Sequence, residues 1–217
     1  MRLFDFFLDL IYPRKCVFCG KVLEKNDICD DCIKNLPYTN GEGIYQKFAF
    51  VKKCVSPLYY EGKVRDSIIR YKFMNSTSYS VRYGAIMSEC VENNLDCGSI
   101  DVISYVPLSR KRLRRRGYNQ AQLIAGEISS RLDIPCMPVL RKIKNNPAQS
   151  KTRNSKQRAK NVSGVYEVLD PKFVKDKCIL LIDDVVTTGS TLSECARMLG
   201  KASAKTVFCA TLARHRD

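Results

Sequence analysis

The fold is decided by residues 179 to 192, which read I-L-L-I-D-D-V-V-T-T-G-S-T-L. The first four are aliphatic with no polar alternation, which is typical of a strand buried on both faces of a parallel sheet. Two carboxylates and a turn of small residues follow, and Leu192, Ala196 and Leu199 then recur at helical spacing. The stretch predicts a strand that ends at the acidic pair, a short loop and a helix.

The loop after the acidic pair has the composition of a phosphate-binding turn. Thr187, Thr188 and Thr191 offer hydroxyls, and the following helix would present N–H groups and the positive end of its dipole. Gly189 permits a tight turn and lets a phosphate approach the backbone. The structural alternative is a strand-to-helix turn whose Asp and Thr side chains only cap the helix.

The acidic pair, Asp183 and Asp184, cannot face that phosphate, because like charges repel. Donors or a cation are the natural partners of the two carboxylates, such as a sugar diol and Mg²⁺. A ligand with a phosphate at one end, vicinal hydroxyls in the middle and a metal-bound group beyond is a phosphorylated ribose. The order D-D-x-x-T-T-G-x-T after four aliphatics resembles the phosphoribosyl-pyrophosphate (PRPP) motif of the type I phosphoribosyltransferases, which favours a PRPP site over a helix cap.

Composition restricts the class of protein. The 217 residues have room for one domain of ordinary size and a small appendage, and 45% hydrophobic with 27% charged residues describes a globular chain. No stretch approaches the roughly 18 apolar residues of a spanning helix, so we expect no stable membrane insertion.

Residues 1–12 predict a helix docked onto the fold, with a membrane-surface or partner helix as the alternative. This segment is a poor signal peptide, so a cytoplasmic location is expected.

The net charge of +15 is large for this size and implies polyanionic partners, either phosphorylated small molecules or nucleic acid. Part of it lies in a run of six cations within residues 110–116, between a predicted strand at 101–108 and a predicted helix at 119–132. We expect a basic loop at the edge of the sheet where open α/β folds bind ligands, positioned to meet the pyrophosphate. Solvated surface charge is the alternative.

A second basic stretch, residues 144–160, contains no acidic residue. It follows a predicted strand at 138–143 and precedes another at 165–168. An excursion of this length is a mobile lid or a disordered segment. A lid could close over a polyphosphate, and the same stretch could clamp single-stranded nucleic acid through phosphate contacts. The lone His215 is interpreted as a surface residue. Earlier in the chain, residues 37–50 are interpreted as a linker, a strand is predicted at 55–60, and helices are predicted at 64–73 and about 78–91.

Four of the eleven cysteines form two C-x2-C knuckles, Cys16/Cys19 and Cys29/Cys32, separated by nine residues. Each knuckle supplies two thiolates at the correct bite for tetrahedral Zn²⁺, and with no open coordination position the zinc would be structural. Free thiols or a redox pair are the alternative. The remaining seven lack ligand spacing and are interpreted as small core residues in a reducing compartment: Cys54, Cys90, Cys97, Cys136, Cys178, Cys195 and Cys209.

Taken together, these elements resemble the ComF family, whose members carry an N-terminal zinc finger and a phosphoribosyltransferase-like domain. The matching elements are the four knuckle cysteines, Y-K-F at 71–73, V-P-L-S at 106–109, R-G-Y-N-Q at 116–120, Gln149, Arg158 with Asn161 and Val162, L-I-D-D-V-V-T-T-G-S-T at 181–191 and L-A-R at 212–214. The resemblance implies an α/β, type I phosphoribosyltransferase-like parallel sheet at residues 41–217 after a four-cysteine zinc finger at 1–40. It also implies a cytoplasmic, PRPP- and Mg²⁺-binding protein of natural transformation, in which incoming single-stranded DNA is handled with a helicase partner.

The expected roles are distributed as follows. Catalytic residues are Asp183 and Asp184, with Arg153 and Arg158 from the lid. PRPP-binding residues are Asp183, Asp184, Val185, Val186, Thr187, Thr188, Gly189, Ser190 and Thr191, with Ser109, Arg110 and Lys111 at the pyrophosphate. Nucleic-acid-binding residues are Arg112, Arg114, Arg115, Arg116, Lys151 and Lys156. Metal ligands are Cys16, Cys19, Cys29 and Cys32.

Two function classes remain open at this point. As an enzyme, the protein would displace pyrophosphate from ribose C1 of PRPP by positioning and charge stabilisation, with an unidentified acceptor. As a binding module, it would sense PRPP while its basic surface holds single-stranded DNA. Purine-salvage relatives often carry Asp two residues before the loop glycine, where this chain has Thr187, so nucleobase salvage is disfavoured.

Overall fold

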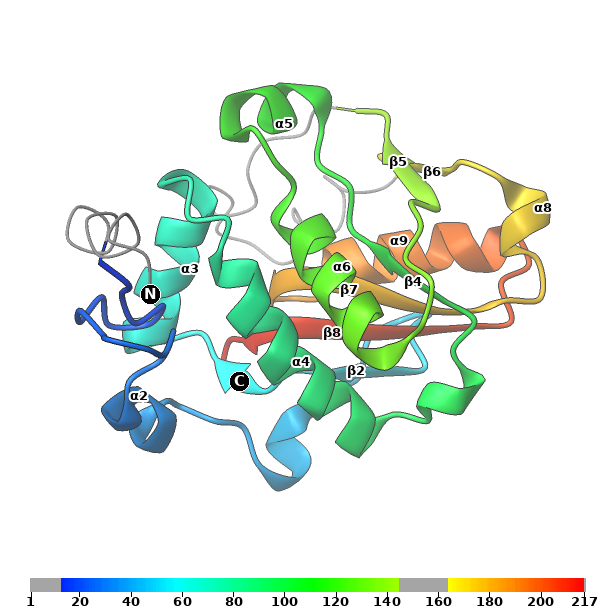
Figure 1. Cartoon of the computed structure of the whole chain (residues 1–217). Coiled ribbons are helices and arrows are strands. Elements are labelled where there is room, and N and C mark those ends of the chain that lie inside the picture. The colour runs from blue at the N-terminus through cyan, green and yellow to red at the C-terminus, as the bar shows by residue number, and fades with distance from the viewer. Residues whose placement is uncertain (1–12, 145–163, 217) are drawn as a thin grey trace.

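A computed structural model describes residues 13–144 and 164–216 (Figure 1). The segment 1–12 and nearly all of the basic stretch 144–160 lie outside the described residues. Within the described part, six strands form one sheet in the order β1-β2-β8-β7-β4, and β3 also pairs with β8. All pairs are parallel except β1–β2. The strands are β1 (Tyr45–Gln46), β2 (Lys53–Val55), β3 (Leu58–Tyr59), β4 (Val102–Tyr105), β7 (Cys178–Val186) and β8 (Thr206–Arg214).

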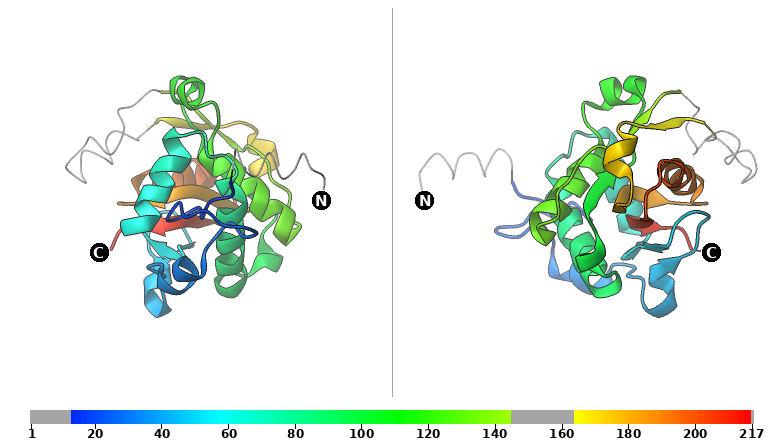
Figure 2. Two further views of the ribbon diagram at one scale, coloured as in Figure 1. Left: turned by 60° about the vertical axis from the view of Figure 1, so that its left-hand side comes forward. Right: turned by 90° about the vertical axis from the view of Figure 1, so that its right-hand side faces the viewer.

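Helices cover both faces of this sheet (Figures 1 and 2). One face is packed by α3 (Gly62–Phe73), α4 (Tyr79–Asn94) and α6 (Gln120–Leu132), and the other by α9 (Ser190–Lys201). The helices predicted at 64–73, 78–91 and 119–132 are therefore confirmed to within three residues at each end. A separate buried cluster fills each face, so the central strands are apolar on both sides, as the aliphatic run at 179–182 predicted.

The central strand β7 differs from the prediction in its length. It runs through the acidic pair to Val186, and Asp183 lies in register with Thr211 of β8. Because successive side chains of a strand point to opposite faces, Asp183 and Asp184 diverge. Asp184 turns toward α3 and Asp183 toward the α9 side.

The strands predicted at 138–143 and 165–168 form, but not in the parallel sheet. β5 (Leu140–Lys142) and β6 (Tyr166–Val168) pair antiparallel as a separate ribbon, which continues into α8 (Pro171–Val174). In Figure 2 this ribbon stands beside the sheet near the end that carries α5. β5 alternates buried Leu140 with exposed Arg141, whereas a central parallel strand needs a continuous apolar run.

The basic run is a helix, and the predicted loop is wrong. α5 (Arg110–Arg116) begins after Ser109, whose hydroxyl accepts a hydrogen bond from the Arg112 N–H, and ends at Gly117 in the left-handed region. Arg and Lys have high helix propensity, and the charges are tolerated because most of these side chains reach solvent. Caps at both ends therefore outweigh the repulsion within the run.

The segment between the finger and α3 also differs from the prediction. The proposed linker 37–50 contains a 3₁₀ turn (Gly41–Ile44) and β1, which pairs with β2. The single strand predicted at 55–60 is divided into β2 and β3 around Ser56 and Pro57, because proline lacks the N–H of a central strand. A further 3₁₀ turn, Cys97–Ser99, precedes β4.

The N-terminal finger packs against the helical layer. Its short helix α2 (Asp30–Asn35) and the buried side chains of Val17, Phe18 and Ile28 belong to the same hydrophobic cluster as α3 and α4. Phe18 contacts Tyr83 of α4 with ring centres 5.9 Å apart. The division at residue 40 stays a prediction. In the described residues, every helix is too short or too polar to cross a membrane.

Candidate functional site

The predicted phosphate loop connects β7 to α9. Gly189 occupies the N-cap position of α9 with φ of +67°, so the chain turns there in a conformation that favours glycine. The hydroxyls of Thr188 and Ser190 are 2.9 Å apart. The ring of Phe48 covers Gly189 so closely that an added Cβ would lie 2.1 Å from a ring carbon. Loop conformation and packing both require a glycine here.

Replacing Gly189 with alanine should damage this loop. The positive φ costs an alanine about 1–2 kcal/mol, and Phe48 must also move. We expect a lower unfolding temperature and weaker PRPP binding by calorimetric titration. Gly200→Ala in the same helix is the control, since open space surrounds Gly200 and alanine there should stabilise by about 0.5–1 kcal/mol. Equal stability of the Gly189→Ala variant and wild type would contradict the prediction.

Asp184 is paired with a lysine from α3. The Lys72 Nζ lies 2.8 Å from an Asp184 carboxylate oxygen, and both side chains are mostly buried. A buried pair is costly to break on one side, because the remaining charge loses its partner. Lys72 therefore holds the Asp184 carboxylate on the α3 side of the sheet.

Asp183 has a different environment. Burial, followed by the negative charge of Asp184, raises the pKa of Asp183 to about 7. The Asp184 N–H donates to the Asp183 carboxylate at 2.9 Å, and the charges of Lys72 and Lys142 oppose the rise. Asp183 is therefore a carboxyl group whose charge changes near neutral pH.

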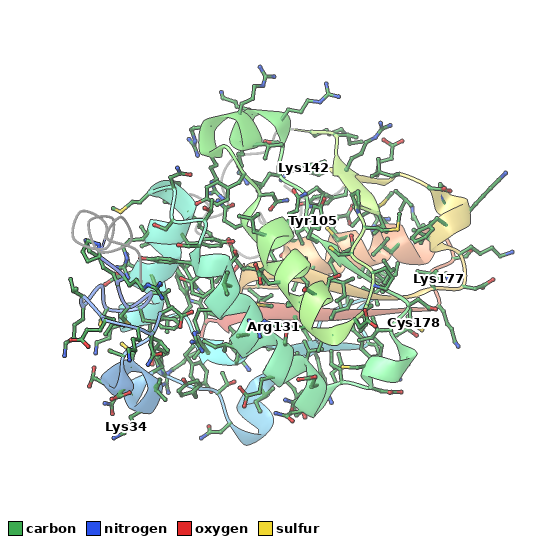
Figure 3. All side chains as sticks on the ribbon, viewed as in Figure 1. Lys34, Tyr105, Arg131, Lys142, Lys177 and Cys178 are labelled. Atoms are coloured by element: carbon green, nitrogen blue, oxygen red, sulfur yellow. The ribbon has the colours of Figure 1, made fainter. Side chains whose placement is uncertain are left out.

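The β5–β6 ribbon contributes Lys142 and Tyr166 to this side. The Lys142 Nζ lies 5.2 Å from the centre of the Tyr166 ring, and burial lowers the pKa of Lys142 to about 8. Lys142 lies below α5 in Figure 3, above Tyr105 of β4. The ammonium group thus approaches the Asp183 side of the sheet from the ribbon.

The residues predicted for pyrophosphate lie at the start of α5. Ser109 is buried and its hydroxyl caps the helix, whereas Arg110 and Lys111 are exposed. Ser109 and Arg110 help to line a cavity of about 480 Å³ between the end of β4, α5, α6 and β5. Arg141, Lys142 and Lys144 line its ribbon side. The charged side chains of the lining are all basic, and an anionic ligand suits them.

The predicted nucleic-acid residues of the basic run are spread around α5. Arg114 and Arg115 are exposed, while Arg112 and Arg116 are partly buried. Nitrogen-tipped side chains project from this helix into solvent in Figure 3. Arg116 turns back toward α6, where it donates to the Gln120 side chain at 2.7 Å. The four predicted residues Lys151, Arg153, Lys156 and Arg158 lie outside the described residues.

The acidic pair and the loop 187–191 thus lie together at the end of β7, and the charge of Asp184 acts on Arg116 at the end of α5. The structure also adds residues that were not predicted. Lys72 was part of the Y-K-F match but received no role. Its signal was present in the sequence: it follows buried Ile68 by four positions and so faces inward, which is unusual for lysine. No local pattern singles out Phe48 or Lys142, because tertiary packing places them.

The four predicted metal ligands form one cluster. The Sγ atoms of Cys16, Cys19, Cys29 and Cys32 all lie within 4.8 Å of one another. Burial tends to raise the pKa of Cys16, but backbone N–H groups of residues 19, 29 and 18 directed at its sulfur lower the pKa to about 6. Burial and the neighbouring cysteines raise the pKa of Cys32. Four crowded thiols ionise together only around a cation, so the cluster fits tetrahedral Zn²⁺.

The predicted core cysteines agree with their assignment in part. Five of them are buried: Cys54, Cys90, Cys178, Cys195 and Cys209. Cys97 and Cys136 are only partly buried. His215 is exposed, as predicted, and its ring lies 5.0 Å from that of Tyr60.

Two family models match the chain. The "Phosphoribosyl transferase domain" matches residues 119–217, and the "Double zinc ribbon domain" matches residues 7–43. The first match contains the acidic pair, the phosphate loop and α6, and the second contains the four-cysteine cluster. The two matches therefore correspond to the two sites that the geometry defines.

Curated relatives extend this similarity to most of the chain. It is 28% identical over 225 residues to Competence protein F of Haemophilus influenzae, covering 92% of this chain and 96% of that protein. It is 27% identical to Competence protein ComFC of Streptococcus pneumoniae, covering 97% and 85%. The chain belongs to the ComF family. This ComF-family chain is also 33% identical over 124 residues to DNA utilization protein YhgH of Escherichia coli O157:H7, covering 52% and 50%.

Family membership confirms two predictions made from the sequence. The ComF resemblance is correct, and so is the fold class, a phosphoribosyltransferase-type α/β sheet preceded by a four-cysteine finger. Structural zinc in the ComF finger is supported by both the matched ribbon domain and the sulfur geometry.

Proposed function

We propose that this ComF-family protein binds PRPP with Mg²⁺ at the end of β7 and holds single-stranded DNA on the adjacent basic surface during natural transformation. One observation carries the proposal: an acidic pair and a phosphate-type loop share the end of the central strand, beside a helix with six cations. The relatives named for competence and DNA utilization support the DNA part.

In this proposal the two ends of PRPP contact different sets of residues. The 5′-phosphate binds the hydroxyls and N–H groups of residues 187–191 at the start of α9. The hydroxyls of the ribose diol would donate to the carboxylates of Asp183 and Asp184, and these carboxylates would also be the groups that hold Mg²⁺. The pyrophosphate extends toward Ser109, Arg110 and Lys111 at the start of α5.

A calorimetric titration of PRPP into zinc-loaded protein, with and without Mg²⁺, tests the small-molecule part. We expect Mg²⁺-dependent binding that Asp184→Asn weakens at least about tenfold, because removing one charged partner of a buried contact costs about 2–5 kcal/mol. Asp133→Asn is the matched control, since Asp133 is exposed at the far end of α6. Absence of PRPP binding to folded wild type would remove this part of the proposal.

The DNA part predicts a specific salt dependence. The exposed arginines Arg110, Arg114 and Arg115 would each contact a phosphate. Replacing all three with glutamine should therefore flatten the plot of log affinity against log salt by about 2 for single strands, from roughly 0.7 per phosphate. The control replaces three exposed lysines on α8 and α9, Lys172, Lys175 and Lys201. An unchanged slope in the arginine variant would exclude α5 from the DNA surface.

The cell compartment and a protein partner belong to the same proposal. All eleven cysteines are free thiols in the structure, and free thiols with a structural zinc suit a reducing compartment. We place the protein in the cytoplasm, where it would receive the strand from a DNA-uptake helicase. Pull-down of such a helicase only in the presence of single-stranded DNA would agree with this order of events.

A second candidate function is an active phosphoribosyltransferase with an unidentified acceptor. The cavity of about 480 Å³ beside the start of α5 favours it, because this space adjoins the predicted pyrophosphate residues Ser109 and Arg110. Its basic lining would suit an anionic acceptor. Acceptor-dependent release of pyrophosphate from PRPP would establish the enzyme. PRPP binding without release across a panel of anionic acceptors would instead support the function of a binding module.

A further inference from the structure

A large aromatic side chain is exposed at the end of α3. The helix buries Val64, Ile68 and Tyr71, and Phe73 points away from that face with 61% of its surface exposed. Met74 beside it is similarly exposed. Isolated exposed apolar residues are normal, so exposure alone implies no function. The surroundings of Phe73 are what distinguish it.

Phe73 forms one wall of a pocket of about 480 Å³ between the end of α3 and the end of α5. The ionisable groups that line it are all cationic: Lys72, Arg115 and Arg116. Asn75 completes the lining. The guanidinium carbon of Arg116 lies 5.0 Å from the centre of the Phe73 ring, so a cation and an aromatic face are already stacked there.

Arg116 is held in place by a hydrogen bond, and its Nε donor has no acceptor in the part of the chain that the structure describes. Its terminal nitrogen donates to Gln120 at 2.7 Å, and burial lowers the pKa of its guanidinium group. Among the described residues, the Arg116 Nε and the Gln120 amide nitrogen are buried without a hydrogen-bond acceptor. A buried donor without a partner calls for an explanation, and a phosphate oxygen in the pocket would supply one for Arg116.

We propose that this pocket binds one nucleotide of a single-stranded nucleic acid, with its base stacked on Phe73 and its phosphate held by Arg115 and Arg116. The inference rests on the proposed DNA-binding function and assigns it a base-contacting site. An aromatic platform next to cations is the combination by which proteins hold single strands without reading their sequence. The pocket volume is in the range that accommodates a small ligand such as a nucleotide.

The pocket adjoins the candidate sugar-phosphate site through a shared residue. Lys72 lines the pocket, and its Nζ lies 2.8 Å from the Asp184 carboxylate. The stacked nucleotide would therefore lie next to the PRPP site but on the α3 side of Lys72. A strand that continued from there would pass along the exposed arginines of α5. This agrees with the phosphate contacts proposed above for Arg110, Arg114 and Arg115.

The test compares two probes with equal charge. Zinc-loaded, full-length protein is titrated with labelled oligothymidylate and with an abasic strand of the same length. Phe73→Ala should weaken oligothymidylate binding about 5- to 150-fold, the range for loss of one base–aromatic stack, and leave the abasic strand unaffected. Phe73→Tyr should restore the affinity. Phe50→Ala is the matched control, because Phe50 is 64% exposed in the turn before β2 and lines neither pocket.

Each other outcome overturns the inference. If Phe73→Ala binds oligothymidylate like wild type, or loses both probes equally, there is no base stack at Phe73. If thymidine monophosphate displaces the strand at concentrations near the strand's own dissociation constant, the pocket is a mononucleotide site. If wild type binds neither probe, the DNA part of the proposed function fails together with this inference. Zinc content and PRPP titration confirm that each variant is folded.

Discussion

Removing zinc should lower the unfolding temperature of the whole protein, not only of the finger. Structural zinc contributes an apparent 10–16 kcal/mol in finger peptides at pH 7. The finger side chains Val17, Phe18 and Ile28 share one buried cluster with α3 and α4, so its loss opens that cluster. If only about 5 kcal/mol of this free energy stabilises the rest of the protein, loss of zinc lowers the unfolding temperature by about 10–20 °C.

Scanning calorimetry before and after chelation, with zinc content measured in parallel, checks this expectation. Cys16→Ser/Cys32→Ser should reproduce the effect of chelation. Cys97→Ser/Cys136→Ser is the matched control, because these two thiols are only partly buried and lie outside the cluster. If chelated protein unfolds at the temperature of the zinc-loaded form, the four thiols do not hold a structural metal.

Zinc loss should also weaken the proposed PRPP binding, because α3 connects the finger to the candidate site beside Asp184. The guanidinium group of Arg70 donates to the carbonyls of Val17 at 3.1 Å and Phe18 at 2.6 Å in the first knuckle. Two residues later, Lys72 holds Asp184. A finger that unfolds removes the partners of Arg70 and so loosens the helix that positions Lys72.

Asp183→Asn should abolish PRPP binding and at the same time stabilise the folded protein at alkaline pH. The folded pKa of Asp183, about 7, lies above the ordinary value of 3.8, so the folded state binds this proton more tightly than the unfolded state does. The contribution of Asp183 to the free energy of unfolding of wild type is therefore greatest below about pH 4. It falls as pH rises and is lowest above about pH 7. Asparagine cannot ionise and avoids that loss.

The expected gain at pH 8 is on the order of 2–4 kcal/mol, and it should disappear near pH 4. Thermal unfolding of both proteins at the two pH values measures it, with Asp133→Asn as the exposed control. In wild type, PRPP affinity should increase as pH passes through about 7, because the ionised carboxylate is the form that accepts hydroxyl protons or Mg²⁺. A variant that is less stable than wild type at pH 8 would contradict the raised pKa.

The order of strand, loop and helix at residues 179–199 could be predicted because each local signal agreed with the fold. An aliphatic run, a permissive Gly189 and a helical apolar period all indicate the same structure. The cysteine spacing was equally informative, since ligand geometry alone dictates it. These parts of the site can be predicted from local sequence, without knowledge of how the rest of the chain packs.

The divergence of the acidic pair could not be predicted in the same way. Whether β7 stops at Asp183 or continues depends on the length of its partner β8, which pairs with it as far as Val186. Lys72 meets Asp184 only because α3 packs on that face of the sheet. Both facts belong to tertiary structure. The local sequence indicates that Lys72 faces inward but not that its partner is Asp184.

The sequence at 110–116 carries signals for the helix that forms in place of the predicted loop. Ser109 at the N-cap and Gly117 after the last turn are ordinary helix boundary signals. The concentration of cations suggested a loop, but exposed charges that point in different directions around a helix repel only weakly in water. The cap residues therefore decide the structure of this run more than its charge does.

The position of β8 in the sheet has a consequence for biosynthesis. β8 pairs with β2, β3 and β7, all of which leave the ribosome before it. Until residues 206–214 emerge, β2 and β7 each expose an unpaired edge, and the two halves of the sheet have nothing between them. The edge of β2 therefore stays unpaired for most of synthesis and the edge of β7 until β8 emerges, and truncation before residue 206 should yield aggregates instead of a smaller folded domain.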